Sequence, residues 1–508
     1  MEELKVILVN VDKCRGCRIC ENNCPLGAIS VIDKIAQLNE NCVSCGICTK
    51  VCPFQVVEKT EEKKSENSTC THCPVNCSVP LNKTGACKRY TNVDGELVRN
   101  RKLVIDSVVK ESEWNVKYKP LITAVGSGTN YPCLRPAPKI VQDTVDGVDV
   151  VTVVTEAPLS YSGVKVKIDT NMDIGEEGAK VKRNGKCVGM VTTEEYGSKM
   201  LTIGGANLLS GSNDGFIVAR TIVDLANGRK VKLKVENGSQ LEIQQGKPPV
   251  IDGLEETYMR VGCGSATIGM FAASLSKAVD EAVILDFHVV GLLSEHAAGK
   301  EVGMKYSGVV PYGRKSTMGR YFGKHGHGWG GTEVESPVEA VKSVDMSIAK
   351  TGYKILVTET TGQKYALLEV QNDGSAKEIE MTEQAVKCVK LISDNCEKSV
   401  VSIMYTGGTG GSARAGVTTF PKKLTNAVHN NEVSMTIAGA PTFVLPGGGI
   451  NFMVDVSKMI PEATTWVPTP ATVAPVEYTM TREKYDEIGG HTNSIITKEQ
   501  LLKELDEE

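Results

Sequence analysis

The chain has 508 residues, with 57 basic and 61 acidic side chains and a net charge of −4. This length exceeds what one hydrophobic core normally absorbs, so we expect several domains. The charges are well mixed and no apolar run approaches a membrane span, which argues against nucleic-acid and membrane partners. The first residues, a short apolar strand behind acidic side chains, do not resemble a signal peptide, so we expect a cytoplasmic protein.

Cysteines dominate the N-terminal part, where twelve of the 17 lie between Cys14 and Cys87. Two runs share the spacing C-x2-C-x2-C-x3-C-P, namely Cys14, Cys17, Cys20 and Cys24, and Cys42, Cys45, Cys48 and Cys52. Both match the bacterial two-cluster ferredoxin pattern, in which the fourth cysteine of each run ligates the other cluster. We therefore expect residues 1–60 to bind two [4Fe–4S] clusters. A zinc module is the alternative, but zinc sites seldom repeat such a run.

A third cysteine group lies within residues 66–95, after a charged linker at 58–66, and consists of Cys70, Cys73, Cys77 and Cys87. Four thiolates at these intervals suit either a third [4Fe–4S] cluster or a structural zinc ion. We favour the cluster because the preceding runs already commit the chain to iron–sulfur assembly, and zinc stays open.

Hairpin signals mark residues 100–254 as a β-rich domain. The pairs Asn184-Gly185 and Asn237-Gly238 each separate two alternating apolar runs, as in tight two-residue hairpins. Residues 255–480 predict a mixed α/β catalytic domain, and residues 481–508 a C-terminal tail. In the catalytic domain, helices are expected from Glu255 to about Ala298, starting with 258–261 and running through 270–273 to 282–285, and then near 338–350 and 383–392. Strands are expected near 354–358, 365–370, 400–405 and 434–445. The fold class is thus α+β, a two-cluster ferredoxin-like domain fused to a large mixed α/β body with a β-rich first part.

Two glycine-rich loops are candidates for binding a cofactor. Iron–sulfur clusters transfer single electrons, so a chain that also reduces an organic substrate needs a flavin, FAD or FMN, to convert them into pairs. Its phosphate suits the helix start at Gly262 and Gly264. It equally suits the loop after the predicted strand 400–405, with Gly408, Gly410 and the cation Arg414. A plain turn is the alternative at each position.

His325 and His327 alternate with glycines beside Trp329. Such a loop suits a proton donor to a substrate that is held against an aromatic face. The alternative is a surface loop with ordinary histidines. His288 and His296 are more typical of core positions.

Taken together, these features resemble one known family. The ferredoxin pair is joined to the Cys70–Cys87 group and to RVGCGSATIGMF (260–271) and GKHGHGWGGT (323–332). This combination is similar, over nearly the full length, to the 6-hydroxynicotinate reductase family of anaerobic nicotinate fermentation. The resemblance implies a ferredoxin-dependent iron–sulfur flavoprotein that reversibly reduces 6-hydroxynicotinate to 6-oxo-1,4,5,6-tetrahydronicotinate. It assigns no catalytic residues.

A heteroaromatic carboxylate substrate would need a cation, and the candidates are Arg260, Arg320, Lys324 and Arg414. Two other functions stay open at this point. One is a non-catalytic iron–sulfur electron-transfer subunit of a larger oxidoreductase, and the other is a related reductase with a different cyclic substrate. The sequence also leaves open whether the chain forms a homo-oligomer.

Overall fold

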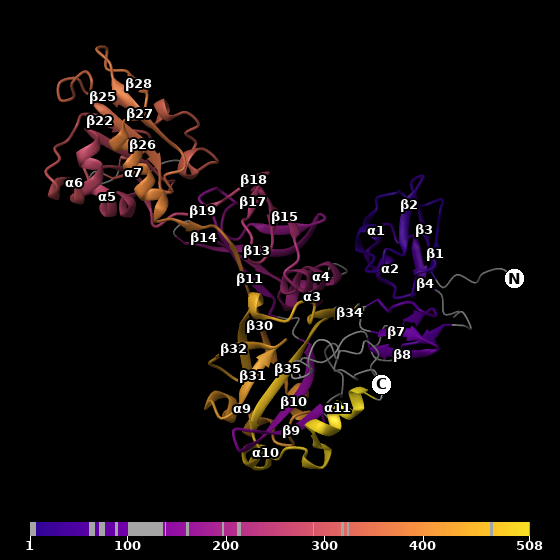
Figure 1. Ribbon diagram of the computed structural model, residues 1–508. Coiled ribbons are helices and arrows are strands. Elements are labelled where there is room, and N and C mark those ends of the chain that lie inside the picture. Colours follow the sequence, from indigo (N-terminus) through magenta and orange to yellow (C-terminus); the bar gives the residue numbers. More distant parts are fainter. Residues whose placement is uncertain are drawn as a thin grey trace.

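The computed structural model describes most of the chain: residues 7–59, 67–70, 77–86, 90–99, 136–137, 139–158, 162–195, 198–210, 215–287, 289–315, 320–322, 325–467 and 471–506. Figure 1 shows an N-terminal module, a central β structure and a separate lobe. Among the described helices, none is both long enough and apolar enough to cross a membrane.

The N-terminal module repeats one pattern twice. Helices α1 (Ile19–Asn23) and α2 (Ile47–Val51) each follow a residue with left-handed backbone, Arg18 and Gly46. Both helices end at the last cysteine of a run, with backbone angles that differ by only a few degrees. Paired strands complete the module and its extension: β1 (Ile7–Val9) with β4 (Val57–Lys59), β2 (Ile29–Ile32) with β3 (Ile35–Leu38), β5 (Ser68–Thr69) with β6 (Ser78–Val79), and β7 (Tyr90–Val93) with β8 (Glu96–Arg99).

A barrel forms the upper part of the central structure in Figure 1. Neighbouring strands are antiparallel and follow one another in the order β30 (Val401–Thr409), β11 (Val164–Asp169), β14 (Ser198–Ile203), β13 (Lys186–Glu195), β12 (Lys180–Arg183), β15 (Val231–Val235) and β16 (Gln240–Ile243). A bridge between Gln245 and Val401 closes the ring. The β12–β13 hairpin turns at Asn184 and Gly185, which both have positive φ, as a type I′ turn requires.

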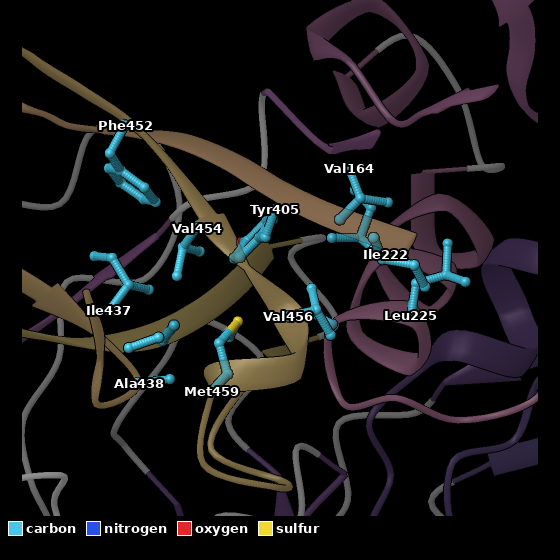
Figure 2. Packing of buried hydrophobic residues seen from close by; sticks show 14 of the residues in the cluster. Val164, Ile222, Leu225, Tyr405, Ile437, Ala438, Phe452, Val454, Val456 and Met459 are labelled. Carbon is cyan, nitrogen blue, oxygen red and sulfur yellow. The ribbon is translucent and has the colours of Figure 1, made fainter. Parts of the chain in front are cut away.

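Strand β30 continues into a second set of antiparallel strands. Their order is β33 (Ile450–Asp455), β32 (Ala440–Leu445), β31 (Ser434–Ile437), β35 (Ala471–Thr481), β10 (Val148–Pro158) and β9 (Lys139–Val145). Helices α8 (Gly411–Ala415), α9 (Pro421–His429), α10 (Arg482–Glu487) and α11 (Lys498–Asp506) accompany these strands. Helix α4 (Gly215–Ala226) packs into the same core, where Figure 2 shows its Ile222 and Leu225 with Val164 and Tyr405.

The lobe is inserted between two strands of the central structure. The chain enters through β19 (Tyr258–Met259) and leaves through β29 (Glu397–Lys398), and these two strands pair with each other. Inside, seven strands follow the order β23 (Arg314–Lys315), β24 (Arg320–Phe322), β21 (Val290–Leu292), β20 (Glu281–Leu285), β26 (Lys354–Glu359), β27 (Tyr365–Val370) and β28 (Ala376–Ile379). Helices α5 (Gly264–Ala278) and α7 (Glu383–Asp394) share a core with this sheet.

Three expected helices of the lobe are wrong. Residues 258–261 contain strand β19, and residues 282–285 lie within β20, which is buried along its whole length. An all-apolar run buried on both faces looks the same in a helix and in a strand. In place of the helix at 338–350, a single 3₁₀ turn at Pro337–Ala340 leads into strand β25 (Val341–Val344). The expected strands at 354–358 and 365–370 and the helix at 383–392 are present as β26, β27 and α7.

Candidate active site and cluster-binding residues

An apolar cavity in the N-terminal module is lined by four cysteines. They are Cys24, Cys42, Cys45 and Cys48, and the apolar lining includes Ile7, Leu26, Ile29, Leu38 and Ile47. Burial raises the pKa of the Cys45 thiol to about 12, and the neighbouring sulfurs of Cys24 and Cys42 add to the increase. Such crowded thiols suit a metal centre, because coordination to metal removes their protons.

A second group of thiols gathers around Cys20. Burial raises the pKa of this thiol to about 11, and the sulfurs of Cys17, Cys52 and Cys14 lie near enough to raise it further. The last cysteine of each run therefore lies with the other run. Backbone amides contribute as well, since the N–H of Ala28 donates to Cys24 Sγ at 3.1 Å. The two donor sets fit two [4Fe–4S] clusters.

The third cysteine group is described in part. Cys70 and Cys77 are both buried, and the N–H of Cys70 donates to the carbonyl of Cys77 at 2.8 Å across the β5–β6 pair. Their side chains pack in one cluster with Val43, against Cys45 of the second run. Cys73 and Cys87 lie outside the described residues. The third group thus adjoins the cysteine-lined cavity.

His325 and His327 lie where the lobe meets the barrel. His325 Nδ1 is 3.3 Å from Asp173 Oδ1, and His327 Nε2 is 3.4 Å from Asp252 Oδ2. Both carboxylates belong to barrel loops, Asp173 after β11 and Asp252 in the turn after β17 (Val250–Ile251). A carboxylate beside an imidazole fixes which nitrogen carries the proton and stabilises the charged ring. Each carboxylate is therefore placed to accept a hydrogen bond from its histidine.

A buried cation and an aromatic ring adjoin His325. The His325 ring stacks on Phe287, with centroids 3.8 Å apart and planes 11° from parallel. Lys199 Nζ lies 4.3 Å from the centre of the Phe287 ring, and this lysine is only 2% exposed. Trp329, which the sequence placed beside the substrate, packs instead against the core of the lobe. The aromatic neighbour of the histidines is Phe287.

Sequence reasoning missed Lys199 although a signal was present. Lys199, Leu201 and Ile203 occupy alternate, buried positions of β14. Alternate residues of a strand share one face, so a lysine in that series points to the inside. Lysine is almost never fully buried unless it is paired. Phe287 and Asp173 carried no comparable signal, because only the folded chain brings them to residues 325–331, which we call the histidine loop.

Glycines allow the histidine loop to fit between the lobe and the barrel. A β-carbon at Gly330 would lie 2.0 Å from the carbonyl oxygen of Leu285 in the lobe. At Gly331 it would lie 2.0 Å from the carbonyl oxygen of Asn171 in the barrel. Both glycines also have positive φ, which other residues adopt at a cost. A side chain at Gly331 would push the lobe away from the barrel, and one at Gly330 would push the loop away from β20 within the lobe.

Two carboxylates flank this contact. Glu256 accepts hydrogen bonds from Thr170 Oγ1 at 3.1 Å and from the N–H of Asn171 at 3.4 Å. Glu359 accepts from the N–H of Gly330 at 3.1 Å. Burial raises the pKa of Glu256 to about 7, and the charge of Glu359 adds to the increase although the hydrogen bond from Thr170 opposes it. Glu256 therefore titrates near neutral pH at the junction of lobe and barrel.

The helix start at Gly264 already holds an anion of its own. The N–H of Gly264 donates to Asp286 Oδ2 at 2.8 Å, and the guanidinium of Arg260 is bonded to the other oxygen of that carboxylate. The Arg260 and Asp286 side chains are fully buried. An internal carboxylate thus stands where a cofactor phosphate was expected, which weakens the hypothesis for Gly262 and Gly264. It also makes Arg260 a poor ligand for a substrate carboxylate.

Gly408, Gly410 and Arg414, the other candidate site for the flavin phosphate, lie at the end of β30. Arg414 Nε donates to the carbonyl of Thr409 at 3.2 Å. A β-carbon at Gly449, in the glycine-rich loop between β32 and β33, would lie 3.6 Å from Arg414 Nη2. The arginine therefore lies between two glycine-rich loops. Its Nη1 already donates to the carbonyl of Pro421 and to Thr425 Oγ1, and its Nη2 is the nitrogen nearest to Gly449. We call Gly407–Gly411, Gly447–Gly449 and Arg414 the Arg414 site.

The Arg414 site and the histidines do not meet. Ser399, just before β30, donates its hydroxyl to the carbonyl of Asp169, close to the Asn171 contact with the histidine loop. Thr409 lies at the opposite end of β30, eight residues beyond Val401. An extended strand rises by about 3.3 Å per residue, so roughly 26 Å separate these ends. The sequence candidates thus divide into two sites.

The remaining candidates contribute little to either site. His296 Nε2 lies 2.9 Å from Ser265 Oγ, and its Nδ1 accepts from the N–H of Ala298. The hydrogen must then be on Nε2, so this histidine donates to Ser265 and cannot activate it as a base. His288, Lys324 and the side chain of Arg320 lie outside the described residues.

Comparison with known proteins gives two matches. The family model of a 4Fe-4S dicluster domain matches residues 13–56. Over 492 residues the chain is 57% identical to the 6-hydroxynicotinate reductase of Eubacterium barkeri, an alignment that covers 96% of this chain and 98% of that protein. No solved structure matches the chain significantly. The N-terminal module is thus a two-cluster ferredoxin-like domain, joined to a mixed helix and strand body.

Proposed function

This chain belongs to the 6-hydroxynicotinate reductase family, and we propose that it reduces 6-hydroxynicotinate to 6-oxo-1,4,5,6-tetrahydronicotinate with electrons from a ferredoxin. It is an iron–sulfur oxidoreductase. The assignment of the substrate rests on the 57% identity over nearly the whole of both chains. The aligned part includes the lobe and the barrel and not only the ferredoxin-like module. A pyridone ring resists reduction, so a strongly reducing donor suits it.

The clusters that the cysteines bind receive the electrons for this reaction. Each cluster is held by four thiolates, one by Cys14, Cys17, Cys20 and Cys52, and the other by Cys24, Cys42, Cys45 and Cys48. The crowding of buried thiols around Cys20 and Cys45 supports these two sets. A third [4Fe–4S] cluster, rather than zinc, is held by Cys70, Cys73, Cys77 and Cys87. Its nearness to Cys45 would make it the next member of the same relay.

The histidine loop provides the protons. Conversion of the substrate to its tetrahydro product takes up two electrons and two protons. His325 and His327 donate those protons. Each imidazole must be protonated before it donates, and Asp173 and Asp252 stabilise that charged form. Lys199, buried beside Phe287, supplies the cation for the substrate carboxylate in place of Arg260.

The Arg414 site holds the phosphate of a flavin, either FAD or FMN. Glycine backbone and one guanidinium are groups that bind phosphate. The fit is supported by open space, because a β-carbon at Gly410, Gly411 or Gly448 would meet no atom within 4 Å. When bound, a flavin supplies the conversion between single electrons and electron pairs.

Metal and flavin analysis of protein purified without oxygen tests the cofactors. Three four-iron clusters give about 12 iron and 12 sulfide per chain, whereas zinc at the third group gives about 8 iron and one zinc. Protein that contains clusters but never any flavin would contradict the flavin proposal.

Turnover tests the substrate. Loss of 6-hydroxynicotinate absorbance should depend on reduced ferredoxin or dithionite, and nicotinate without the hydroxyl group serves as the control. A chain with intact clusters that reduces neither compound would instead favour a non-catalytic electron-transfer subunit.

A further inference from the structure

The two cluster-binding loops, Cys14–Cys20 (the first loop) and Cys42–Cys48 (the second loop), have similar backbones but different surroundings. Position by position, Arg15 of the first loop matches Val43 of the second, and Arg18 matches Gly46. Arg15, Cys17 and Arg18 are exposed, whereas Val43, Ser44 and Ile47 are 1–6% exposed. Arg15, Cys17 and Arg18 of the first loop therefore face solvent, whereas Ile19 packs near the α4 contact. The second loop is covered by other parts of the chain.

Helix α4 of the body covers the second loop. Its Val223 packs with Ile47 and Val51 of helix α2. One turn earlier on the same face, Arg220 Nη1 donates to the carbonyl of Asn22 at 3.0 Å, two residues before Cys24. The other covering segment is the third cysteine group, which packs against Val43 and Cys45. The second loop thus contacts both parts of the chain that could receive electrons.

The exposed first loop carries two arginines, Arg15 and Arg18, at positions where the second has Val43 and Gly46. Lys13, Arg15, Arg18 and Lys34 surround Cys17, and Lys34 belongs here because a β-carbon at Gly16 would lie 2.7 Å from its Cα. Asp12, Glu21 and Asp33 share this face, and Glu21 lies 3.4 Å from Arg18. The balance leaves one excess positive charge, and both arginines lie close to the exposed cysteine in the sequence. Electrostatic complementarity of this kind steers an acidic partner.

We propose that the ferredoxin-like module has a fixed direction. Electrons enter at the Cys14–Cys20 loop, where Arg15 and Arg18 dock an acidic ferredoxin. They leave at the Cys42–Cys48 loop. Arg220, bonded to Asn22 beside Cys24, is a positioning residue that holds the module on α4 and favours reduction of the cluster that Cys24 shares with that loop. This direction rests on the proposed function, because it presumes clusters on both cysteine sets.

Charge is the physical reason for the role of Arg220. Reduction adds one negative charge to a cluster, and a nearby permanent cation stabilises the reduced form. Arg220 is only partly exposed, so water screens its charge incompletely. Asp224 lies 3.9 Å from Arg220 Nε and offsets part of the effect, but Arg183 and Arg229 also pair with that carboxylate. Arg220 should therefore raise the potential of the second-loop site.

Potentiometric titration followed by electron paramagnetic resonance tests the role of Arg220 in the full-length protein. Arg220→Gln should lower the ratio of reduced to oxidised second-loop cluster up to tenfold at a given potential, which is 59 mV for a one-electron couple. Arg220→Lys should restore most of the shift. Arg183→Gln is the matched control, since it removes a cation from Asp224 without a contact to Asn22. Equal titrations of Arg220→Gln and Arg183→Gln, or of Arg220→Gln and wild type, would overturn the proposal.

Reduction kinetics test the docking face. The double variant Arg15→Glu, Arg18→Glu should be reduced by ferredoxin at least tenfold more slowly at low salt, with a weaker dependence on salt, while dithionite reduces it at the normal rate. Lys50→Glu, on the exposed side of α2, should leave both rates unchanged. Equal slowing in both variants would contradict docking at the first loop. Wild-type protein without two clusters would instead contradict the proposed function, so the two failures are distinguishable.

Discussion

The two candidate sites of the body lie at the two ends of strand β30, and they consist of different chemical groups. Near Val401, side chains from the lobe and the barrel bring together histidines, carboxylates and a buried lysine. Near Thr409, the site consists of glycine backbone and the single cation Arg414. In the proposed function, the first end exchanges protons and the second binds the phosphate of a flavin. The difference indicates that protonation of the ring and retention of a flavin can be disturbed separately.

The largest expected effect separates the two ends most clearly. The double variant His325→Ala, His327→Ala should reduce turnover of 6-hydroxynicotinate about 10²–10⁴-fold, the usual contribution of general acids. Flavin and iron contents should stay at wild-type values, because the Arg414 site and the cysteines are untouched. Steady-state kinetics with a parallel cofactor analysis make the measurement. Unchanged turnover would show that the protons come from elsewhere.

A pH effect on stability is expected at the histidine end. The folded-state pKa of Glu256 is about 7, above its ordinary value of 4.5, so the folded chain binds this proton more tightly than the unfolded chain. The resulting stabilisation is fully present below pH 4.5 and is lost as the pH rises through 7. The shift corresponds to at most about 3 kcal/mol.

Glu256→Gln should remove this dependence, because glutamine imitates the protonated acid at every pH. Thermal unfolding midpoints between pH 5 and 8 measure the effect. Glu255→Gln, at the exposed neighbouring residue, provides the control. The unfolding midpoint of the wild type should fall more between pH 5 and 8 than that of Glu256→Gln. Equal falls in the two proteins would show that Glu256 is ionised in the folded protein.

An intermediate effect is expected at the opposite end of β30. Arg414→Met should weaken flavin binding about 10–100-fold, because a hydrogen bond to a charged group contributes about 1.5–3 kcal/mol. Flavin per chain and reconstitution with added FAD or FMN measure the change, and Arg414→Lys should retain part of the affinity. Lys422→Met, an exposed cation on nearby α9, is the control. Normal flavin content in Arg414→Met would move the flavin to another part of the molecule.

Sequence alone could predict the module because its chemistry is local. The spacing of Cys14 to Cys24 and of Cys42 to Cys52 fixes both the loop and the ligands, and the family match to residues 13–56 confirms the two-cluster domain. The hairpin at Asn184-Gly185 was equally local, since one dipeptide sets both positive φ angles. Patterns that act within a dozen residues were therefore sufficient here.

The histidine end could be predicted only in part because its partners are distant in sequence. His325 meets Asp173 and Phe287, and Phe287 in turn meets Lys199; these three come from other segments, and no spacing rule links them. The lobe itself went unrecognised for a related reason. Its boundaries depend on the pairing of Tyr258 with Lys398, across 140 residues of sequence. Likewise, only the folded strand reveals that Gly408 lies far from the histidines.

The smallest expected effect distinguishes the two histidines from each other. His325 is 25% exposed and is stacked on Phe287, whereas His327 is 44% exposed. An ion pair in water contributes about 0.2–1 kcal/mol, so Asp252→Asn should lower turnover less than about fivefold. Asp173→Asn should cost more, because its imidazole is held against a ring and is screened less by solvent. Turnover of the two variants, compared with wild type across pH, gives the ranking. A larger loss in Asp252→Asn would make His327 the principal proton donor and leave His325 to position the ring of Phe287.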